Sequence, residues 1–398
     1  MPHISVITPA YNAAATIGRT IASVQAQTFA DWEHIIIDDG SSDDTRAVID
    51  ATRDSRLRYY YQPNRGPGEA RNHGLRISHG EYVIFLDAGD WWSEVCLEIL
   101  TARLQDKGPG TISHGDWAYA DSQGNVGRTQ SSAFSAGEGL QTLLRFNPLA
   151  IHTALVPRQA VVDVGGFAPW GMLEDWHLWL QLARAGYRFV HAPALVAYYH
   201  WQPDSRSRNI DRRKSERLAT LDEFWATLDP GHPLQSIRGQ SYATAYIDLC
   251  VSRFGQGDDG QALAEFDAAV AAYRPVIEQI DTYYRVAYAE QSAHEGTTEQ
   301  LRETLDATAA GRRIDQLLDH IHRHYSPDET RHASRAAHAA LGLAHYHERR
   351  HAPARSHLMS AVRADPSAIL DLDVGGTLAK TLMPAKWLDR VRERRTVG

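Results

Sequence analysis

Pairs of carboxylates follow two apolar runs of the sequence, where a chain leaving a buried strand turns. Asp38 and Asp39 end the run EHIIIDD, and Asp87 and Asp90 lie in VIFLDAGD. Carboxylates placed close together repel one another unless protons or a cation lie between them. Paired hard oxygen ligands suit Mg²⁺ or Mn²⁺, and these ions in turn bind phosphate oxygens. The pattern therefore predicts a nucleotide phosphate site that is made through a divalent metal.

Glycine-based phosphate motifs do not explain this pattern. The sequence contains no GxxxxGK[ST] motif. Gly66-Pro67-Gly68 precedes a predicted helix, but Pro67 and the missing third glycine do not fit a dinucleotide fingerprint. We interpret this segment as a turn.

The elements that must position the carboxylates alternate between strand and helix signals. Short β-branched runs predict strands over 3–8, 33–37, 57–62 and 82–86, and helical spacing of apolar residues predicts helices over 14–27, 45–53 and 69–78. This alternation favours an α/β fold with a mostly parallel sheet flanked by helices. In such sheets ligands bind at the carboxyl ends of the strands, which is where both acidic pairs lie.

Composition limits the classes of function. The chain has 398 residues, with 41 Lys and Arg against 49 Asp and Glu, for a formal net charge of -8. A general nucleic-acid binder is more often basic, so we expect no nucleic-acid partner. The question is then what supplies positive charge for an anionic ligand.

Cysteine usage and hydropathy favour a cytoplasmic protein. Cys96 and Cys250 are far apart, which excludes a disulfide framework. We find no secretory signal and no run of 18 apolar residues that would span a membrane. A short basic segment over 386–395 suits either a solvated helix end or peripheral contact with the inner face of a membrane.

The second half of the chain has a different texture. After about Arg212 the strand signals disappear, and Ala, Leu, Glu, Arg and His dominate. We therefore expect two domains, 1–210 and 211–398, the second all-α. Two stretches have the small-residue, apolar and proline offsets of a tetratricopeptide unit, and a plain helical bundle remains the alternative. The matching residues are Leu341, Gly342, Ala354, Leu358, Ala361 and Pro366, echoed by Ala262, Phe266, Ala269 and Pro275.

Several motifs of the first half stand in the order of a known family. They read PAYN, then IIIDDGSSDDT, NRG with ARNHG, FLDAGDWW, GGF and EDWHLW. In this order and spacing the sequence resembles family 2 glycosyltransferases, over roughly residues 1–208. The resemblance implies a GT-A fold, a nucleotide-diphosphate sugar donor such as a UDP-sugar, a divalent metal (Mn²⁺ or Mg²⁺) and inversion at the anomeric carbon.

The resemblance also assigns the donor site. In the family the loop after the first strand and an aspartate after the second hold the nucleoside, and an arginine lies beside the donor. An aromatic ring in that loop can stack on the base. The donor-binding residues implied here are Thr8, Pro9, Ala10, Tyr11, Asn12, Asp39, Arg71 and Asp87.

The metal motif of the family commonly reads Asp-x-Asp-Asp, and this chain departs from it. Gly89 stands at the third position, so only Asp87 and Asp90 remain. We expect Asp87 near the ribose or the metal and Asp90 as the metal ligand. Fewer charged ligands bind a metal more weakly. His200 lies near a loop that in the family closes on the diphosphate, and we consider it a further metal or phosphate contact.

The second acidic motif of the family supplies the base. Glu174 and Asp175 open an amphipathic helix predicted over 176–185. A direct displacement needs a group that takes the proton of the acceptor hydroxyl. We assign Asp175 to this role, with Glu174 as the second candidate. For the acceptor we expect an aromatic platform of Trp92, Trp170 and Trp176.

Two other functions remain open from the sequence. A nucleotidyltransferase also uses a metal at a strand end, although it usually has a glycine-rich loop where this chain has ITPAYN. The second alternative is a catalytically weak scaffold that acts through its helical half. It stays open because Gly89 weakens the metal motif. The acceptor class (carbohydrate, lipid-linked or protein), a role in polysaccharide biosynthesis, and a protein partner or self-association through the helical half are also left open.

Overall fold

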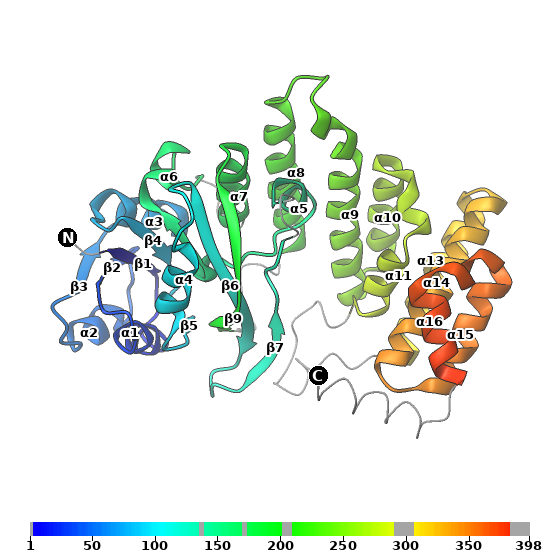
Figure 1. Ribbon diagram of the computed structural model, residues 1–398, viewed down its shortest axis with the longest axis horizontal. Coiled ribbons are helices and arrows are strands. Elements are labelled where there is room, and N and C mark those ends of the chain that lie inside the picture. The colour runs from blue at the N-terminus through cyan, green and yellow to red at the C-terminus, as the bar shows by residue number, and fades with distance from the viewer. Residues whose placement is uncertain (1–2, 135–138, 169–172, 201–208, 290–305, 383–398) are drawn as a thin grey trace. The chain divides into compact units, whose positions relative to one another are not determined.

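The computed structural model describes residues 3–134, 139–168, 173–200, 209–289 and 306–382 (Figure 1). These residues form two compact units, which divide between Ser241 and Tyr242. The first unit is α/β and the second is helical, as the sequence predicts.

The division lies beyond the boundary expected at residue 210. Helix α8 (Ile210–Ala226) packs with the first unit through Arg217. This side chain donates from Nη2 to the backbone oxygen of Arg145 at 2.9 Å, and its guanidinium lies 5.5 Å from the ring centre of Trp176.

One mixed sheet forms the centre of the first unit. Its strand order is β3-β2-β1-β4-β8-β6-β9-β5, and β7 pairs with β6. The strands are β1 (Ile4–Ala10), β2 (Trp32–Asp38), β3 (Leu57–Tyr61), β4 (Tyr82–Phe85), β5 (Trp91–Trp92), β6 (Thr111–Ala120), β7 (Val126–Gln130), β8 (Ala154–Pro157) and β9 (Arg188–His200). The helices of this unit are α1 (Ile17–Gln25), α2 (Thr45–Asp50), α3 (Pro67–Ile77), α4 (Cys96–Leu104), α5 (Gly139–Arg145), α6 (Arg158–Asp163), α7 (Glu174–Arg184) and α8, with a 3₁₀ turn η1 (Ile151–Thr153) and a further turn η3 (Pro233–Ile237).

The apolar run of β2 is buried on both faces because helices cover the sheet on both sides. Ile36 packs with α1 and α2, whereas Ile35 and Ile37 pack with Ala70 of α3. Successive side chains of a strand point to opposite faces, so α3 lies on the face opposite α1 and α2. This arrangement is the reason that the strand signal is a continuous apolar run.

The first four strands of the sheet are parallel, as predicted, and their carboxyl ends lie together. Ala10 pairs with Asp38, and Asp38 pairs with Tyr61. On the other side of β1, Ile7 pairs with Phe85. The residues that follow β1, β2, β3 and β4 are therefore brought to one edge of the sheet.

The other half of the sheet was not predicted as strands. β8 pairs antiparallel with β4 and β6, and β5 pairs antiparallel with β9, whereas β6 and β9 are parallel with two register shifts. The long β9 contributes Tyr198 and His200 near the end of β4, through its pairing with β5. This part of the sheet carries few pure apolar runs, so periodicity alone gives a weak signal.

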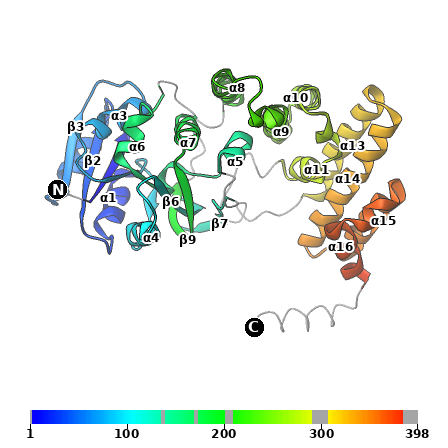
Figure 2. The same cartoon turned by 45° about the horizontal axis from the view of Figure 1, so that its top comes forward.

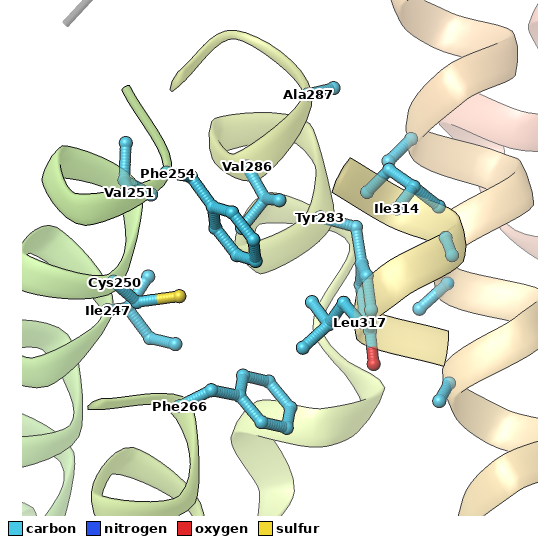
Figure 3. Close-up of a cluster of buried hydrophobic side chains, with 14 of the residues drawn as sticks. Ile247, Cys250, Val251, Phe254, Phe266, Tyr283, Val286, Ala287, Ile314 and Leu317 are labelled. Carbon is cyan, nitrogen blue, oxygen red and sulfur yellow. The ribbon is translucent and has the colours of Figure 1, made fainter. Parts of the chain in front are cut away.

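The second unit is built from helices that pack around one core. They are α9 (Arg238–Gly255), which begins in the first unit, α10 (Asp259–Ala272), α11 (Ile280–Ala287), α13 (Ala307–His324), α14 (Pro327–His347), α15 (His351–Ala364) and α16 (Leu372–Leu382), with short turns η4 (Arg274–Glu278) and η5 (Pro366–Leu370). Figure 3 shows Phe254, Phe266, Tyr283 and Leu317 pointing into this core. Tyr283 is fully buried, and its hydroxyl donates to the backbone oxygen of Ile277 at 2.7 Å.

The tetratricopeptide-like offsets fall on packed helix pairs. Helices α14 and α15 lie side by side in both ribbon views (Figures 1 and 2), and Gly342 of α14 faces Leu358 of α15. Pro366 opens η5 directly after α15, and Pro275 lies in η4 directly after α10. The assignment to tetratricopeptide repeats stays a prediction.

Candidate active site

The loop after β1 turns sharply at the carboxyl edge of the sheet. Asn12 has a φ of 48°, a left-handed conformation that asparagine tolerates better than most residues. Its side-chain oxygen accepts the Ser42 N–H at 2.8 Å, and its own N–H donates to the Ser41 hydroxyl at 2.9 Å. The loops after β1 and β2 therefore fix each other.

Only part of the predicted nucleoside-binding segment lies on the surface. Thr8, Pro9 and Ala10 are buried within β1, and the Thr8 hydroxyl lies 2.8 Å from His34 Nε2. Tyr11, in contrast, is 47% exposed at the edge of the sheet. The side chains of Thr8–Ala10 are thus not accessible to a nucleoside. The neighbouring loop residue Tyr11 presents its ring to solvent.

Asp39 holds the loop that leads into α3. Its Oδ1 accepts Gln62 Nε2 at 2.8 Å and the Arg65 N–H at 2.9 Å, while Oδ2 accepts the Gly66 N–H at 2.8 Å. Gly66 has a φ of 90° and is the N-cap of α3. The carboxylate expected at the nucleoside is buried beneath this turn, so it shapes this edge of the sheet.

A buried arginine joins the two acidic motifs. Arg71 of α3 is 3% exposed, and it donates to Asp87 Oδ1 at 2.6 Å and to Glu174 Oε1 at 2.7 Å. Burial by itself lowers the pKa of the guanidinium, but the two carboxylates outweigh it and raise that pKa. Arg71 therefore stays charged and fixes α7 to the end of β4.

Asp175 lies in the same cluster but has a different environment. Its Oδ1 accepts the backbone N–H of Trp176 at 2.6 Å, and its Oδ2 faces the Asn147 amide nitrogen at 3.2 Å. Burial and the neighbouring Glu174 charge raise the pKa of Asp175 to about 7, against the lowering effects of the Trp176 N–H and Arg71. A carboxylate with this pKa can accept a proton near neutral pH.

The two carboxylates of the metal motif differ in accessibility. The side chain of Asp87 is 41% exposed, with Oδ1 bound to Arg71. The side chain of Asp90 is 6% exposed; its Oδ1 accepts the His200 N–H at 2.7 Å, and its Oδ2 lies 3.0 Å from His152 Nδ1 in an orientation short of a well-formed hydrogen bond. Asp87 is thus the carboxylate with accessible oxygens.

The different exposure of Asp87 and Asp90 decides which of them a divalent metal could reach. Among the described residues, no three His, Cys, Asp or Glu side chains converge on one point. Gly89, with a φ of 149°, occupies the position of the missing carboxylate, and a Cβ there would lie 3.6 Å from His200 Nδ1. Mg²⁺ that binds together with phosphate groups usually takes only one or two protein carboxylates, and Asp87 is the accessible carboxylate of this motif.

The aromatic residues expected at the acceptor are mostly internal. Trp92 and Trp176 are buried and donate their indole N–H groups to the backbone oxygens of His152 and Leu143, at 2.8 and 2.7 Å. Both rings are therefore core residues, too buried to stack on an acceptor sugar as the sequence predicts. Trp170 lies outside the described residues.

A different tryptophan lies nearer the surface. Trp91 stacks on Tyr198 with ring centres 5.5 Å apart, and the Arg19 guanidinium lies 3.7 Å from its ring centre. Nη2 of Arg19 also donates to the Gly89 oxygen at 3.2 Å. No motif of the sequence marks Arg19, because a single arginine in an amphipathic helix gives no signal of what it contacts.

Comparison with known proteins places these residues in context. The family described as "Glycosyl transferase family 2" matches residues 5–163. A UDP-Glc:alpha-D-GlcNAc-diphosphoundecaprenol beta-1,3-glucosyltransferase of Escherichia coli is 30% identical over 225 residues, which cover 56% of this chain and 86% of that protein. A GalNAc(5)-diNAcBac-PP-undecaprenol beta-1,3-glucosyltransferase of Campylobacter jejuni is 35% identical over 35% of this chain and 44% of that protein.

Two relatives of uncharacterized function are matched over less than two thirds of their own length. An uncharacterized glycosyltransferase of Haemophilus influenzae is 36% identical over 40% of this chain, and the match spans 64% of that protein. An uncharacterized glycosyltransferase of Rickettsia felis is 31% identical over 38% of this chain, and the match spans 25% of that protein.

A solved structure supports the fold. The crystal structure of S. aureus TarS 1-349 in complex with UDP-GlcNAc is similar with a TM-score of 0.50 and 16% identity, over 87% of this chain and 92% of that one. At this identity the likeness concerns the fold alone.

Proposed function

Because the chain belongs to glycosyl transferase family 2, we propose that it transfers a sugar from a UDP-sugar donor to a hydroxyl of a lipid-linked carbohydrate acceptor. The observation that carries the proposal is the position of Asp175 beside the Arg71 ion pairs with Asp87 and Glu174. The names of the Escherichia coli and Campylobacter jejuni relatives, both undecaprenol-linked glucosyltransferases, support the donor and acceptor classes.

The nucleoside half of the donor would bind at the loops after β1 and β2. Tyr11 presents an exposed ring on which a base can stack, and the fixed Asn12 loop holds that ring at the edge of the sheet. Asp39 already accepts three hydrogen bonds, from one side chain and two backbone N–H groups. A base N–H would have to bind beside these three donors. We propose Asp39 as a residue that shapes the pocket first and contacts the base second.

The diphosphate would lie at the end of β4. Asp87 would hold a Mn²⁺ or Mg²⁺ ion there, and that ion supplies positive charge for the diphosphate as it leaves. Asp90 supports this segment from behind, through the His200 N–H and the nearby His152 ring, so we propose Asp87 rather than Asp90 as the direct contact.

Proton transfer falls to Asp175. The acceptor hydroxyl must lose its proton as it attacks the anomeric carbon, and a partly buried carboxylate with a pKa near 7 can take it. Arg71 stays charged beside it, because its contacts to Asp87 and Glu174 raise the pKa of its guanidinium. One base and one displacement give inversion at the anomeric carbon.

The helical unit and the membrane complete the proposal. No described helix is long and apolar enough to cross a bilayer. A lipid-linked acceptor would bring the protein to a membrane surface as a peripheral partner in polysaccharide biosynthesis. The helical unit would serve a protein partner or a second copy, because stacked helix pairs present extended binding surfaces.

A donor panel with Mn²⁺ and the variant Asp175→Asn tests the catalytic proposal. We expect release of nucleoside diphosphate with an undecaprenol-linked acceptor to fall by roughly 10²–10⁴-fold in the variant, the usual contribution of a general base. The wild-type rate should rise as pH passes through about 7, where Asp175 loses its proton. The matched control is Asp50→Asn, an exposed aspartate of α2 that should keep the wild-type rate.

The released product separates the alternatives. A transferase releases nucleoside diphosphate, whereas a nucleotidyltransferase releases pyrophosphate. If wild type and Asp175→Asn both release nucleoside diphosphate only at background level across the whole panel, the chain is not an active transferase. The catalytically weak scaffold is then the remaining interpretation.

A further inference from the structure

We propose that Asn147 is a positioning residue for Asp175: its amide holds the carboxylate in place and favours the ionised, proton-accepting form. Asn147 follows α5 in the sequence and belongs to none of the acidic or aromatic motifs. The inference rests on the proposed role of Asp175 as the base and adds a second residue to that role.

The orientation of the Asn147 amide is determined by its neighbours. Its side-chain oxygen accepts the Leu149 N–H at 3.1 Å, so the nitrogen must be the atom that faces Asp175 Oδ2 at 3.2 Å. An amide nitrogen only donates hydrogen bonds. It therefore stabilises a carboxylate and cannot accept a hydrogen bond from a protonated Oδ2.

The other carboxylate oxygen is also fixed by a donor. Asp175 Oδ1 accepts the Trp176 N–H at 2.6 Å. With a donor on each oxygen, both hydrogen bonds are stronger to the charged carboxylate than to the neutral acid, so both favour the ionised form. Asn147 and the Trp176 N–H thus oppose burial and the charge of Glu174, which favour protonation.

The fold couples Asn147 to the helix that carries the base. Trp176, the residue after Asp175, donates its indole N–H to the Leu143 oxygen of α5 at 2.7 Å. From α8, Arg217 donates to the Arg145 oxygen at the end of the same helix at 2.9 Å. The buried Trp176 and the half-buried Arg217 therefore fix the end of α5, and with it Asn147, relative to Asp175.

The test is the pH profile of kcat/KM for sugar transfer in Asn147→Ala and Asn147→Asp. Loss of one hydrogen bond to a carboxylate should move the acid limb to higher pH by about one unit in Asn147→Ala. Activity at pH 6 should then fall about tenfold and recover above the shifted limb. Asn147→Asp should shift the limb further, because it places a second negative charge against Asp175. Asn125→Ala, which removes an exposed turn asparagine bonded to Asp121, is the control.

Each outcome decides the proposal. An unshifted limb in both Asn147 variants, with activity either unchanged or lowered equally at all pH values, overturns it. The aspartate side chain has nearly the same shape as asparagine. The Asn147→Asp variant can therefore still be measured if Asn147→Ala fails to fold. If Asp175→Asn itself transfers sugar at the wild-type rate, the proposed role of Asp175 as the base fails instead, and background-level release by the wild type is the separate result that excludes the enzyme.

Discussion

Arg71 is the counter-charge for the carboxylates that gather at the site. The chain carries a net charge of -8, and three of its acidic residues, Asp87, Glu174 and Asp175, lie close together at the site. A guanidinium that is 3% exposed and bound to two of these carboxylates offsets their repulsion. Breaking a buried ion pair by removing one partner is costly, because the remaining charges lose their counter-ion.

Replacement of Arg71 should therefore destabilise the fold. We expect Arg71→Ala to lower the free energy of unfolding by about 3 kcal/mol in urea at pH 7. Arg76→Ala is the control on the same helix: Arg76 is 59% exposed in its pair with Glu69, and its loss should change stability by less than about 0.5 kcal/mol. Equal destabilisation by the two substitutions would mean that the buried ion pairs of Arg71 contribute no more than the exposed pair of Arg76.

At the scale of elements, close helix contacts depend on glycine where a side chain has no room. A Cβ on Gly342 of α14 would lie 2.6 Å from Leu358 Cγ and 3.1 Å from the Leu358 backbone nitrogen of α15. Gly311 of α13 has nothing within 4 Å of the same atom. The two glycines share a helical conformation but differ in what surrounds them.

Alanine at these two positions should act in opposite directions. Gly342→Ala forces α14 and α15 apart and should destabilise the helical unit by about 1–3 kcal/mol. Gly311→Ala should stabilise it by up to about 1 kcal/mol, because alanine favours the helix. Urea unfolding followed by circular dichroism at the helical band measures both. Equal effects of the two substitutions would mean that the α14–α15 contact is not a tight one.

At the scale of the whole molecule, two compact units have separate cores. Tyr283 and Phe266 belong to the core of the helical unit, whereas Ile36 and Ile84 belong to the sheet of the first unit. The residues proposed for the donor and for catalysis all lie in the first unit. A ligand that binds only the native first unit should therefore stabilise that unit.

Calorimetry of the full chain tests this separation. We expect two unfolding transitions, and UDP with Mn²⁺ should raise the temperature of only one of them. At a UDP concentration of a hundred times the dissociation constant, the free energy of unfolding of that unit should rise by about 2.7 kcal/mol. Gly342→Ala should lower the other transition. A single transition that responds to both changes would show that the units unfold together.

Much of the fold and part of the site could be predicted from local sequence. The apolar runs of β1, β2 and β4 identify the parallel half of the sheet, because strands buried on both faces are apolar throughout. The acidic pairs that follow them, and the glutamate and aspartate that open α7, could be found because chemistry-bearing residues stand at strand and helix ends. The motif order identified the family.

Tertiary structure alone decided which of those residues face one another. The predicted metal ligand Asp90 is held by the backbone of His200, 110 residues away, and the Trp92 and Trp176 rings are core residues. Asn147 carries no motif, and its role appears only when α5 packs against α7. Residue type and spacing determine local elements and their chemistry, whereas burial and contact depend on packing between distant segments, which no local pattern records.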